Sequence, residues 1–590
     1  MEDSRVRTSA RSAATGAAAG GAIGMLLLVL PTADNLNEAV LLPVGNRVLA
    51  AVLHVMLAVG IGLVTEVLFR RGAGSAAGAS GGLLVGLLWW MLGPLTLTPL
   101  LDGRGPTWSM ADAADTFPNL VTALFVGGVA GALTTALGPR ISKLPWAQRR
   151  ASGRGAEPNR IVVLGGGFGG VATAKRLEQL MLADADLTVS LVSPSNSLLF
   201  TPMLAEVAGS ALQPHHISAP IRAMCPRTRF YRDEVADIDL DRQVVHLRGS
   251  PDPLPYDHLV IALGSVPNYR DLPGLAEHSF SLKSLPDAVA LRNHVVAMLE
   301  RADVEADAEE RRRQLTFVVA GGGFAGTETI AELFDLVHNA RRYYPHIDPA
   351  ELRFVLVHSG DRILPEIGPE LADFALQRLR RRGIEFILGA RVGAATAEAV
   401  DLTDDRRLPT RTFVWTAGNQ PHPVLASLAV ARNRAGALMV DETLRSTTRP
   451  DVWAVGDCAQ IPDPLTGGNH PPTAQHALRE GKALAENIGA VIAGRPPKPF
   501  RFTAIGILVA LGHRTAVAEI RGLRFSGLAA WMLWRGVYLS KLPGLEKKLR
   551  VVIDWTIDLL FPRDIVLAAE PDGQRQRTPA SAEPDTGGRR

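Results

Sequence analysis

Two glycine-rich segments with the same spacing, 156 residues apart, limit the possible folds of this chain more than any other feature. The first, 165–170, follows the apolar run 161–164, and the second, 321–326, follows the apolar run 317–320. In a strand, G-x-G-x-x-G, helix unit, the glycines allow a tight turn, a close approach of the backbone to a pyrophosphate, and close packing of the helix on the strand. One such pattern is weak evidence, but two with flanking strands and helices predict two dinucleotide-binding sites.

The pattern between residues 160 and 495 predicts an α/β fold with two Rossmann-like domains. Short β-branched runs alternate there with helical patterns, which is typical of parallel sheets covered by helices. The strand-like run 452–455 leads into Gly456 and Asp457, an acidic residue placed to bind the ribityl hydroxyls of a flavin. We therefore expect an FAD-binding domain in two segments, with a nicotinamide-binding domain inserted between them, because electrons pass between two stacked cofactor rings. The predicted boundaries are 160–300 for the first FAD segment, 301–425 for the NAD(P)H domain, and 426–495 for the second FAD segment.

The first 145 residues predict a four-helix transmembrane module, joined to the rest by a linker at 146–159. Each of four apolar stretches is long enough, or nearly so, to cross a bilayer. These stretches are 13–30, 48–69, 76–101 and 117–137. Basic residues flank one side and acidic residues the other, so the positive-inside rule predicts a multi-pass cell-membrane protein with its catalytic domain in the cytoplasm. Four buried helices of a soluble domain are the alternative.

A second membrane-directed region follows at 496–570. Apolar and aromatic stretches at 523–539 and 549–561 are interleaved with basic residues, which predicts amphipathic helices docking on membrane lipid. A packed pair of core helices is the alternative. The last segment, 571–590, is predicted to be disordered.

Charge and cysteine content exclude several classes of function. The net charge is only +3, and much of the basic excess lies beside apolar stretches, so we expect an anionic lipid surface and no nucleic acid as partner. The two cysteines, Cys225 and Cys458, are far apart, which argues against a disulfide scaffold and against a redox cysteine pair. No clustered ligands predict a metal site.

Several motifs in 160–565 resemble those of the type II NADH:quinone oxidoreductases. The motifs are Leu199 to Gly209 and Ile217 to Arg222 near the flavin, Trp415 to Gly418 near the nicotinamide, Ala454 to Ala459 in the second FAD segment, Pro472 to Ala477 under the flavin, and Leu523 to Gly527 before the docking tail. The resemblance implies a membrane-bound, non-proton-pumping enzyme of the respiratory chain. Such an enzyme takes a hydride from NADH onto FAD and passes electrons to a quinone. It also implies a homodimer.

The resemblance further implies roles for individual residues, with Glu328 and Gln475 as the catalytic candidates. FAD is expected at Gly165, Gly167, Phe168, Gly169, Gly170, Ser193, Thr201, Pro202, Ala262, Gly264, Gly456 and Asp457. The nicotinamide cofactor is expected at Gly321, Gly323, Phe324, Gly326, Glu328, His358 and Gly418. Gln475 is expected to face the quinone headgroup beside the flavin.

The chain departs from the family pattern at both ribose positions and at the quinone motif. Ser193 stands where an acidic residue contacts the adenosine ribose of FAD, which predicts weaker binding there. His358 stands where the family has a glutamate, and Arg362 is nearby in the sequence. NADPH is therefore an alternative to NADH as the hydride donor. Arg479 replaces the second glutamine of the quinone motif, so the identity of the acceptor is also open.

Two other functions compete with quinone reduction. One is an NAD(P)H–flavin reductase with a non-quinone acceptor such as a carrier protein or dioxygen. The other is a membrane sensor or transport protein whose N-terminal module is regulated by the flavin. A flavin disulfide reductase and a sulfide:quinone oxidoreductase are disfavoured because both use paired cysteines.

Overall fold

The computed structural model describes residues 75–92, a few residues between 120 and 132, and residues 158–181, 187–504 and 506–567. The chain divides into two compact units, Met1–Ala156 and Glu157–Arg590.

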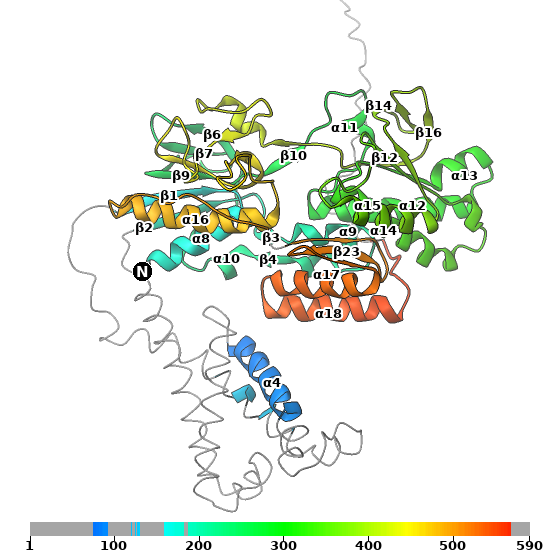
Figure 1. Cartoon of the computed structure of the whole chain (residues 1–590), viewed down its shortest axis with the longest axis horizontal. Helices are drawn as coiled ribbons and strands as arrows, with labels where there is room; N and C mark the ends of the chain where they lie inside the picture. The colour runs from blue at the N-terminus through cyan, green and yellow to red at the C-terminus, as the bar shows by residue number, and fades with distance from the viewer. Residues whose placement is uncertain are drawn as a thin grey trace, which may run out of the picture. The chain divides into compact units, whose positions relative to one another are not determined.

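The N-terminal unit contains one described helix, α4 (Ser75–Leu92), which overlaps the expected span 76–101 (Figure 1). The expected spans 13–30 and 48–69, and most of 117–137, lie outside the described residues. Within the described part of the chain, no helix has both the length and the apolar character needed to cross a membrane. The four-helix transmembrane expectation therefore gains no support from the structure.

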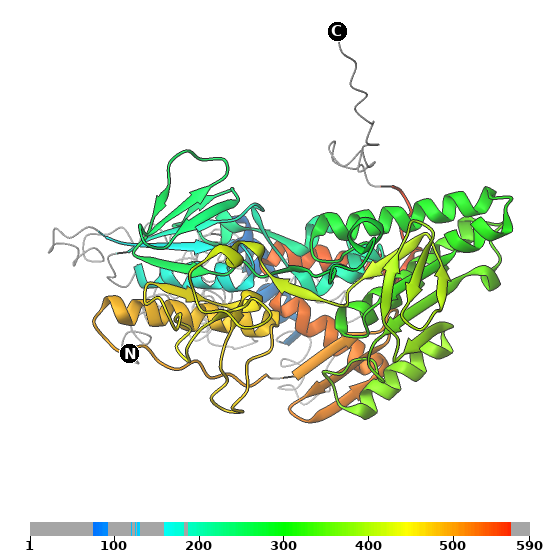
Figure 2. The same ribbon diagram turned by 90° about the horizontal axis from the view of Figure 1, so that it is seen from above.

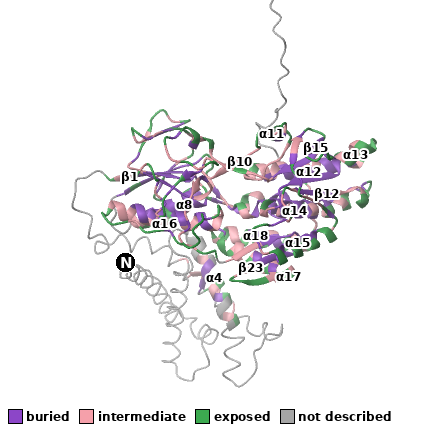
Figure 3. Ribbon diagram, turned by 45° about the horizontal axis from the view of Figure 1, so that its top comes forward, coloured by how far each residue is buried: buried purple, intermediate pink, exposed green. Residues whose placement is uncertain are grey.

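The second unit contains a five-stranded parallel sheet built around the first glycine-rich turn. In order across the sheet, the strands are β20 (Val452–Ala454), β9 (His258–Ile261), β1 (Asn159–Leu164), β2 (Leu187–Val192) and β5 (Arg229–Tyr231). Helices α8 (Phe168–Met181) and α16 (Ala474–Ile492) pack against each other beside this sheet (Figure 1). Residues 161–164 of β1 are apolar and buried, as is typical of a central parallel strand, and Figure 3 shows α8 and the neighbouring strands as mostly buried.

A four-stranded parallel sheet is inserted between the two halves of the first domain. Its strands are β13 (Ile384–Leu388), β12 (Arg353–His358), β11 (Thr316–Ala320) and β17 (Thr412–Trp415). The accompanying helices are α12 (Leu285–Val304), α13 (Ala308–Gln314), α14 (Phe324–Ala340) and α15 (Pro369–Arg381). The predicted α/β architecture of two dinucleotide-binding folds is thus confirmed.

Two chain segments connect these folds and pair with each other. Strands β10 (Ser265–Pro267) and β18 (Asn419–Pro421) form an antiparallel ribbon, with Val266 opposite Gln420. In Figures 1 and 2 this ribbon lies between the two sheets. The folds are therefore tied together beside the strand ends, where the glycine-rich turns also lie.

Small antiparallel sheets and short elements complete the second unit. The small sheets are formed by β3 (Ser197–Leu199) with β4 (Ser218–Pro220), β6 (Val235–Asp239) with β7 (Val244–Leu247) and β8 (Leu254–Pro255), and β14 (Val392–Ala395) with β15 (Ala399–Leu402) and β16 (Arg407–Pro409). The remaining short elements include η3 (Thr201–Met203), α9 (Leu204–Ala208), η4 (Pro214–Ile217), α10 (Ile221–Met224), α11 (Leu275–His278), η7 (Pro423–Ser427), β19 (Leu438–Met439), η8 (Gly456–Cys458) and β21 (Ala459–Gln460).

The C-terminal region combines a three-stranded antiparallel sheet with two helices. These elements are β22 (Gly506–Ala510), β23 (Ala516–Ile520), β24 (Leu523–Ser526), α17 (Gly527–Lys541) and α18 (Leu545–Leu560). The two helices match the amphipathic stretches predicted from the sequence, but residues 523–526 form a strand because they pair with β23. The tail 571–590 lies outside the described residues.

Candidate active site

The first glycine-rich turn has the shape needed to hold a dinucleotide. Gly165 has φ +112°, and a Cβ atom there would lie 2.1 Å from the carbonyl oxygen of Ala262. A Cβ atom at Gly170 would lie 1.9 Å from the carbonyl oxygen of Gly165, so β1 and α8 approach too closely for a side chain. By contrast, a Cβ atom at Gly167 would meet no described atom within 4 Å. Two glycines thus serve packing and the third leaves room for a ligand, as the FAD pyrophosphate requires.

The second turn repeats this geometry. Gly321 has φ +117°, and a Cβ atom there would lie 2.5 Å from Oγ1 of Thr416. A Cβ atom at Gly326 would lie 1.8 Å from the carbonyl oxygen of Gly321. At Gly323, the N-cap of α14, the nearest atom is Oε1 of the exposed Glu366 side chain, at 3.1 Å. The residues of both turns therefore fit a dinucleotide.

At the end of β12, His358 is held by the second glycine-rich turn. Its Nδ1 accepts a hydrogen bond of 3.1 Å from the backbone N–H of Gly322, which fixes the proton of the neutral ring on Nε2. Burial lowers the pKa of His358, so the ring is neutral at physiological pH. The guanidinium of Arg362 donates to the carbonyl oxygen of Pro365 at 3.1 Å. At the end of β2 in the other fold, Ser193 is buried.

Asp457 lies at the start of the second FAD segment, in η8. Its Oδ2 accepts a hydrogen bond of 2.7 Å from Oγ of Ser265, whose oxygen in turn accepts one of 3.1 Å from Nζ of Lys283. The preceding Gly456 has φ +74°, and its N–H donates to Oε2 of Glu480 at 2.9 Å. Burial raises the pKa of Glu480 to about 7.

The other expected FAD and nicotinamide residues surround these turns. Phe168, the first residue of α8, packs edge-to-face on Phe200 with ring centroids 5.8 Å apart, directly before the η3 turn of Thr201 and Pro202. Gly264 has φ +68° and open space beside it. Of the remaining positions, Gly169 packs against Val455, and Ala262 directly follows β9. Phe324 begins α14. The carbonyl oxygen of Gly418 accepts a hydrogen bond from the N–H of Asn268.

Gln475 lies in the first turn of α16 and contacts the C-terminal sheet. Its Nε2 lies 3.4 Å from the carbonyl oxygen of Gly506. Arg479, one turn later, donates to the carbonyl oxygen of Gln475 at 2.9 Å, and its guanidinium lies 4.2 Å from the centroid of the Phe502 ring. Burial lowers the pKa of Arg479. The cation that replaces a glutamine is therefore stacked beside the expected quinone segment.

Glu328 points away from the glycine-rich turn and toward the C-terminal sheet. Its Oε1 accepts a hydrogen bond of 3.1 Å from the N–H of Ala510 in β22. Burial raises the pKa of Glu328 to about 8. One turn later on α14, Glu332 is buried with a pKa raised to about 7, also by burial. Glu206 of α9 is buried too, and its Oε1 accepts from Nε1 of Trp555 at 3.1 Å. The side chains of Glu206, Glu328 and Glu332 are thus covered by protein.

Sequence reasoning missed three residues of the site: Ser265, Lys283 and Glu480. Ser265 directly follows the turn glycine Gly264, so this turn could have indicated Ser265 as a residue of the site. Glu480 directly follows Arg479 of the quinone motif, but no sequence pattern indicated its contact with the N–H of Gly456. Lys283 is distant in sequence from every motif, and only the tertiary fold brings it to Ser265.

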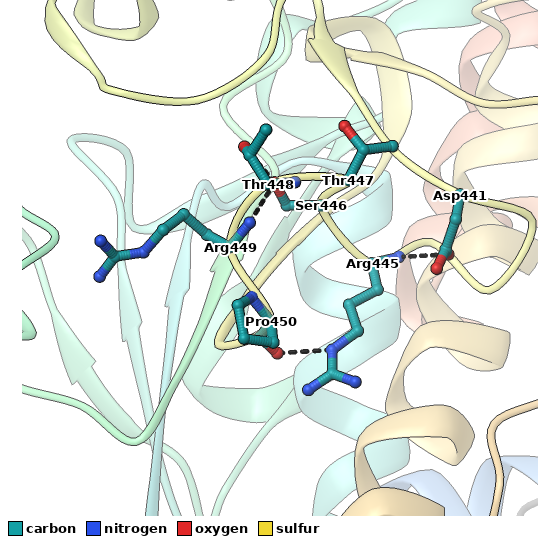
Figure 4. Close-up of a pocket in the computed structure, with 7 residues that line it drawn as sticks. All are labelled: Asp441, Arg445, Ser446, Thr447, Thr448, Arg449 and Pro450. Carbon is teal, nitrogen blue, oxygen red and sulfur yellow. Dashed lines mark hydrogen bonds between the residues drawn. The ribbon is translucent and has the colours of Figure 1, made fainter.

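A surface pocket lies apart from this site. It is lined by Asp441 and by residues 445–450 in the loop between β19 and β20 (Figure 4). Its two arginines are engaged internally, since Arg445 donates to the carbonyl oxygen of Pro450 and Arg449 pairs with Asp241 at 2.9 Å. Nothing in this lining points to a ligand.

Comparison with known families agrees with the geometry. A family model described as pyridine nucleotide-disulphide oxidoreductase matches residues 159–481, more than half of the chain. A second model, the NDH2 C-terminal domain, matches residues 505–564. Fold and site therefore define a flavoprotein oxidoreductase of the pyridine nucleotide-disulphide class. The two cysteines of the chain, Cys225 and Cys458, are both free and buried.

Known relatives narrow the class. The type II NADH:quinone oxidoreductase Ndh of Mycobacterium tuberculosis is 31% identical over 422 residues, which cover 69% of this chain and 89% of the relative. A probable NADH dehydrogenase of Dictyostelium discoideum is 30% identical over 429 residues, which cover 71% and 93%. The chain belongs to the type II NADH:quinone oxidoreductases. Membership confirms the predicted oxidoreductase with FAD and NADH as cofactors.

Solved structures show the same fold. NDH2 from Plasmodium falciparum in complex with NADH aligns with a TM-score of 0.64 at 20% identity, covering 69% of this chain and 99% of that chain. The sulfide:quinone oxidoreductase of Aquifex aeolicus aligns with a TM-score of 0.55 at 19% identity, covering 70% and 96%. At these identities the likeness concerns the fold alone.

Proposed function

We propose that this chain oxidises NADH and reduces a quinone at a membrane surface. The observation that carries the proposal is the presence of two open glycine turns in one compact unit, tied together by the β10–β18 ribbon. FAD, when bound, would supply the redox chemistry of hydride uptake from NADH and of two-electron transfer to the acceptor. The protein itself binds and orients the two dinucleotides and the acceptor.

The FAD domain is assigned to 160–300 and 426–495. Its glycines and the N-terminus of α8 bind the pyrophosphate, since N–H groups and the helix dipole favour an anion there. Asp457 binds the ribityl chain, and Ser193 takes the place of the usual ribose acid. Residues 199–202 would hold the flavin ring. The full set assigned to FAD is Gly165, Gly167, Phe168, Gly169, Gly170, Ser193, Thr201, Pro202, Ala262, Gly264, Gly456 and Asp457.

The NADH domain is assigned to 301–425. Its residues are Gly321, Gly323, Phe324, Gly326, His358 and Gly418, with Glu328 on the same helix. Because His358 is neutral and Arg362 is turned to a backbone carbonyl, neither of these two described residues aims a cation at a 2′-phosphate. This supports NADH as the donor, with NADPH as the measurable alternative.

The acceptor site is assigned to the start of α16, where Gln475 reaches the carbonyl oxygen of Gly506 and Arg479 stacks on Phe502. A flat, apolar quinone with two carbonyl oxygens suits an aromatic wall beside an amide and a guanidinium. The same cation would attract an anionic carrier protein, so a non-quinone acceptor is the second candidate. R479Q restores the glutamine of the family motif and distinguishes the two. For a quinone acceptor, R479Q should change KM for the quinone while flavin reduction by NADH is unaltered.

Attachment to lipid is assigned to α17 and α18. Large apolar side chains on these helices face solvent, and Lys541, Lys547 and Lys548 lie beside them, as docking on an anionic leaflet requires. The most exposed of these apolar residues are Leu528, Met532, Leu549, Ile553, Ile557, Leu560 and Phe561. For residues 1–145 we retain a four-span anchor with a cytoplasmic catalytic unit, on the sequence pattern alone, and a homodimer on family resemblance.

An anaerobic titration of the detergent-solubilised holoenzyme tests the function. NADH or NADPH is added in separate runs, and the visible flavin absorbance is followed before and after addition of menaquinone or ubiquinone analogues. Bleaching by NADH and recovery with a quinone are expected. Bleaching without recovery would replace the quinone with another acceptor. Absence of bleaching with either nucleotide would overturn the dehydrogenase proposal and favour the flavin-regulated sensor.

A further inference from the structure

Lys283 is a half-buried cation in the flavin site that no motif contains. It lies in the segment between α11 and α12, and its Nζ donates to Oγ of Ser265 at 3.1 Å. Ser265 Oγ donates onward to Oδ2 of Asp457 at 2.7 Å. Lysine, hydroxyl and carboxylate thus form one hydrogen-bonded chain drawn from three separate segments.

The chain of hydrogen bonds crosses the connection between the two dinucleotide folds. Ser265 begins β10, whose partner β18 follows directly after the nicotinamide strand end at Gly418. Three residues before Lys283, Phe280 bridges Val414 of β17, with hydrogen bonds on both sides. One connecting segment therefore pairs with β18 and the other with β17, and Asp457 is the FAD-domain end of the same hydrogen-bonded network.

The segment that carries Lys283 is itself fixed. The backbone N–H of Lys283 donates to Oδ2 of Asp287 at 3.0 Å, and Asp287 forms a capping box with Ser284 at the start of α12. The capping box orders the backbone, so the lysine side chain extends from a defined position toward Ser265. A side chain on a rigid backbone loses little further conformational freedom when it orients a neighbouring side chain.

The donor and acceptor counts indicate what the lysine does. Ser265 satisfies Oδ2 of Asp457, and the described residues give Oδ1 no hydrogen-bond partner, so Oδ1 is available to a ligand hydroxyl. An ammonium has three N–H donors, and the described residues engage one of them. Taking a cation out of water is costly unless negative charge compensates it. Burial lowers the pKa of Lys283, and the negative charge of Asp457 opposes that shift.

We propose that Lys283 is a positioning residue of the flavin site: through Ser265 it orients Asp457 toward the cofactor, and its buried charge favours the electron-rich reduced form of the flavin. The inference rests on the proposed binding of FAD at Asp457. It assigns Lys283 no proton transfer and no contact with NADH.

The test compares K283M and K283R in the full-length protein, with K482M as the control. Lys482 is an exposed residue of α16 in the same domain, so its replacement removes a lysine without touching the site. Two quantities are measured for each variant: the dissociation constant of FAD, by flavin fluorescence, and the midpoint potential of the bound flavin, by anaerobic spectroelectrochemistry. K283M is expected to weaken FAD binding roughly tenfold or more, as loss of a charge-assisted hydrogen bond predicts, and to lower the potential.

K283R should retain most of the affinity and the potential because it keeps the charge and a donor. S265A should weaken FAD binding and leave the charge in place, so its potential should change less than that of K283M. Equal affinity and potential in K283M and K482M would overturn the proposal. Equal losses in K283M and K283R with an unchanged potential would also overturn it, because they indicate packing alone.

D457N separates this inference from the proposed function. If D457N binds FAD like the wild type, Asp457 does not hold the ribityl chain, and the assignment on which the inference rests has failed. If D457N weakens binding while K283M does not, the FAD site stands and only the role of Lys283 is rejected.

Discussion

Arg563 and Glu332 form a buried ion pair, with Nη1 of the arginine 2.9 Å from Oε2 of the glutamate. The arginine follows α18 and reaches across to α14 of the nicotinamide fold. Its Nη1 also donates to the carbonyl oxygen of Gly209 beyond α9 at 2.7 Å, and its Nε pairs with Asp558 at 3.0 Å. One side chain thus joins the C-terminal helices to both dinucleotide folds.

Replacing Arg563 should destabilise the protein strongly. R563M leaves Glu332 and the carbonyl group of Gly209 buried without their cation, and leaves Asp558 with Arg535 as its cation at 3.8 Å. Breaking one side of such a buried pair costs about 3–5 kcal/mol. R550M is the matched control, because Arg550 pairs with Glu546 on the exposed face of α18 and should cost about 1 kcal/mol or less. Denaturant midpoints of the holoenzyme measure both. Equal midpoints for the two variants would mean that the buried pair contributes no more than the surface pair.

Stability should fall with rising pH because of Glu328. Its pKa is raised to about 8 by burial, whereas an unfolded glutamate titrates near about 4.3. Between these values the folded protein binds more protons than the unfolded chain, so the free energy of unfolding decreases as pH rises. E328Q cannot ionise, and its amide oxygen can still accept from the N–H of Ala510.

Melting temperatures from about pH 5 to about pH 8.5 test this expectation, since that window begins just above the unfolded pKa and includes the folded pKa. E328Q should melt above the wild type at the alkaline end, and its melting temperature should fall less steeply with pH. E546Q, a change at an exposed glutamate of α18, should follow the wild-type curve. Parallel curves for wild type and E328Q would contradict the raised pKa.

The glycine turns were predictable from the sequence because their constraint is local. A positive φ at Gly165 and Gly321, and the contacts that forbid a Cβ atom at Gly170 and Gly326, follow from a strand turning directly into a helix. Asp457 was also found because it follows a strand ending in the same pattern. Short-range geometry therefore sufficed to recover both folds.

The hydrogen-bonded partners were not predictable because they depend on long-range packing. Lys283 and Ser265 meet Asp457 from segments 174 and 192 residues away. The strand at 523–526 has amphipathic character that suits a helix as well, and only pairing with β23 decides it. The orientation of Glu328 toward Ala510 likewise depends on the docking of β22 against α14, which no local pattern encodes.

A carboxylate in place of His358 should sharpen the preference for NADH. A neutral imidazole neither repels nor attracts a 2′-phosphate. A charged residue at this position would do one or the other. H358E should raise the ratio of kcat/KM for NADH over NADPH roughly tenfold or more. H358N, which stays neutral, should leave the ratio near the wild-type value. Binding of 5′-AMP and 2′,5′-ADP, measured by calorimetry, gives the same comparison without turnover, and an unchanged ratio in H358E would place the adenosine ribose elsewhere.

Alanine at Gly167 and at Gly170 should fail in opposite ways, although both belong to one motif. At Gly170 the new methyl group would lie 1.9 Å from a backbone oxygen of Gly165, so G170A should misfold or lose several kcal/mol of stability by forcing β1 and α8 apart. At Gly167 the methyl group meets no protein atom within 4 Å, so G167A should fold normally. It should nevertheless bind FAD at least about tenfold more weakly, because the methyl group enters the space that the pyrophosphate needs. Circular dichroism, melting of the FAD-depleted protein and FAD titration separate folding from binding, and wild-type FAD affinity in G167A would remove the pyrophosphate from this turn.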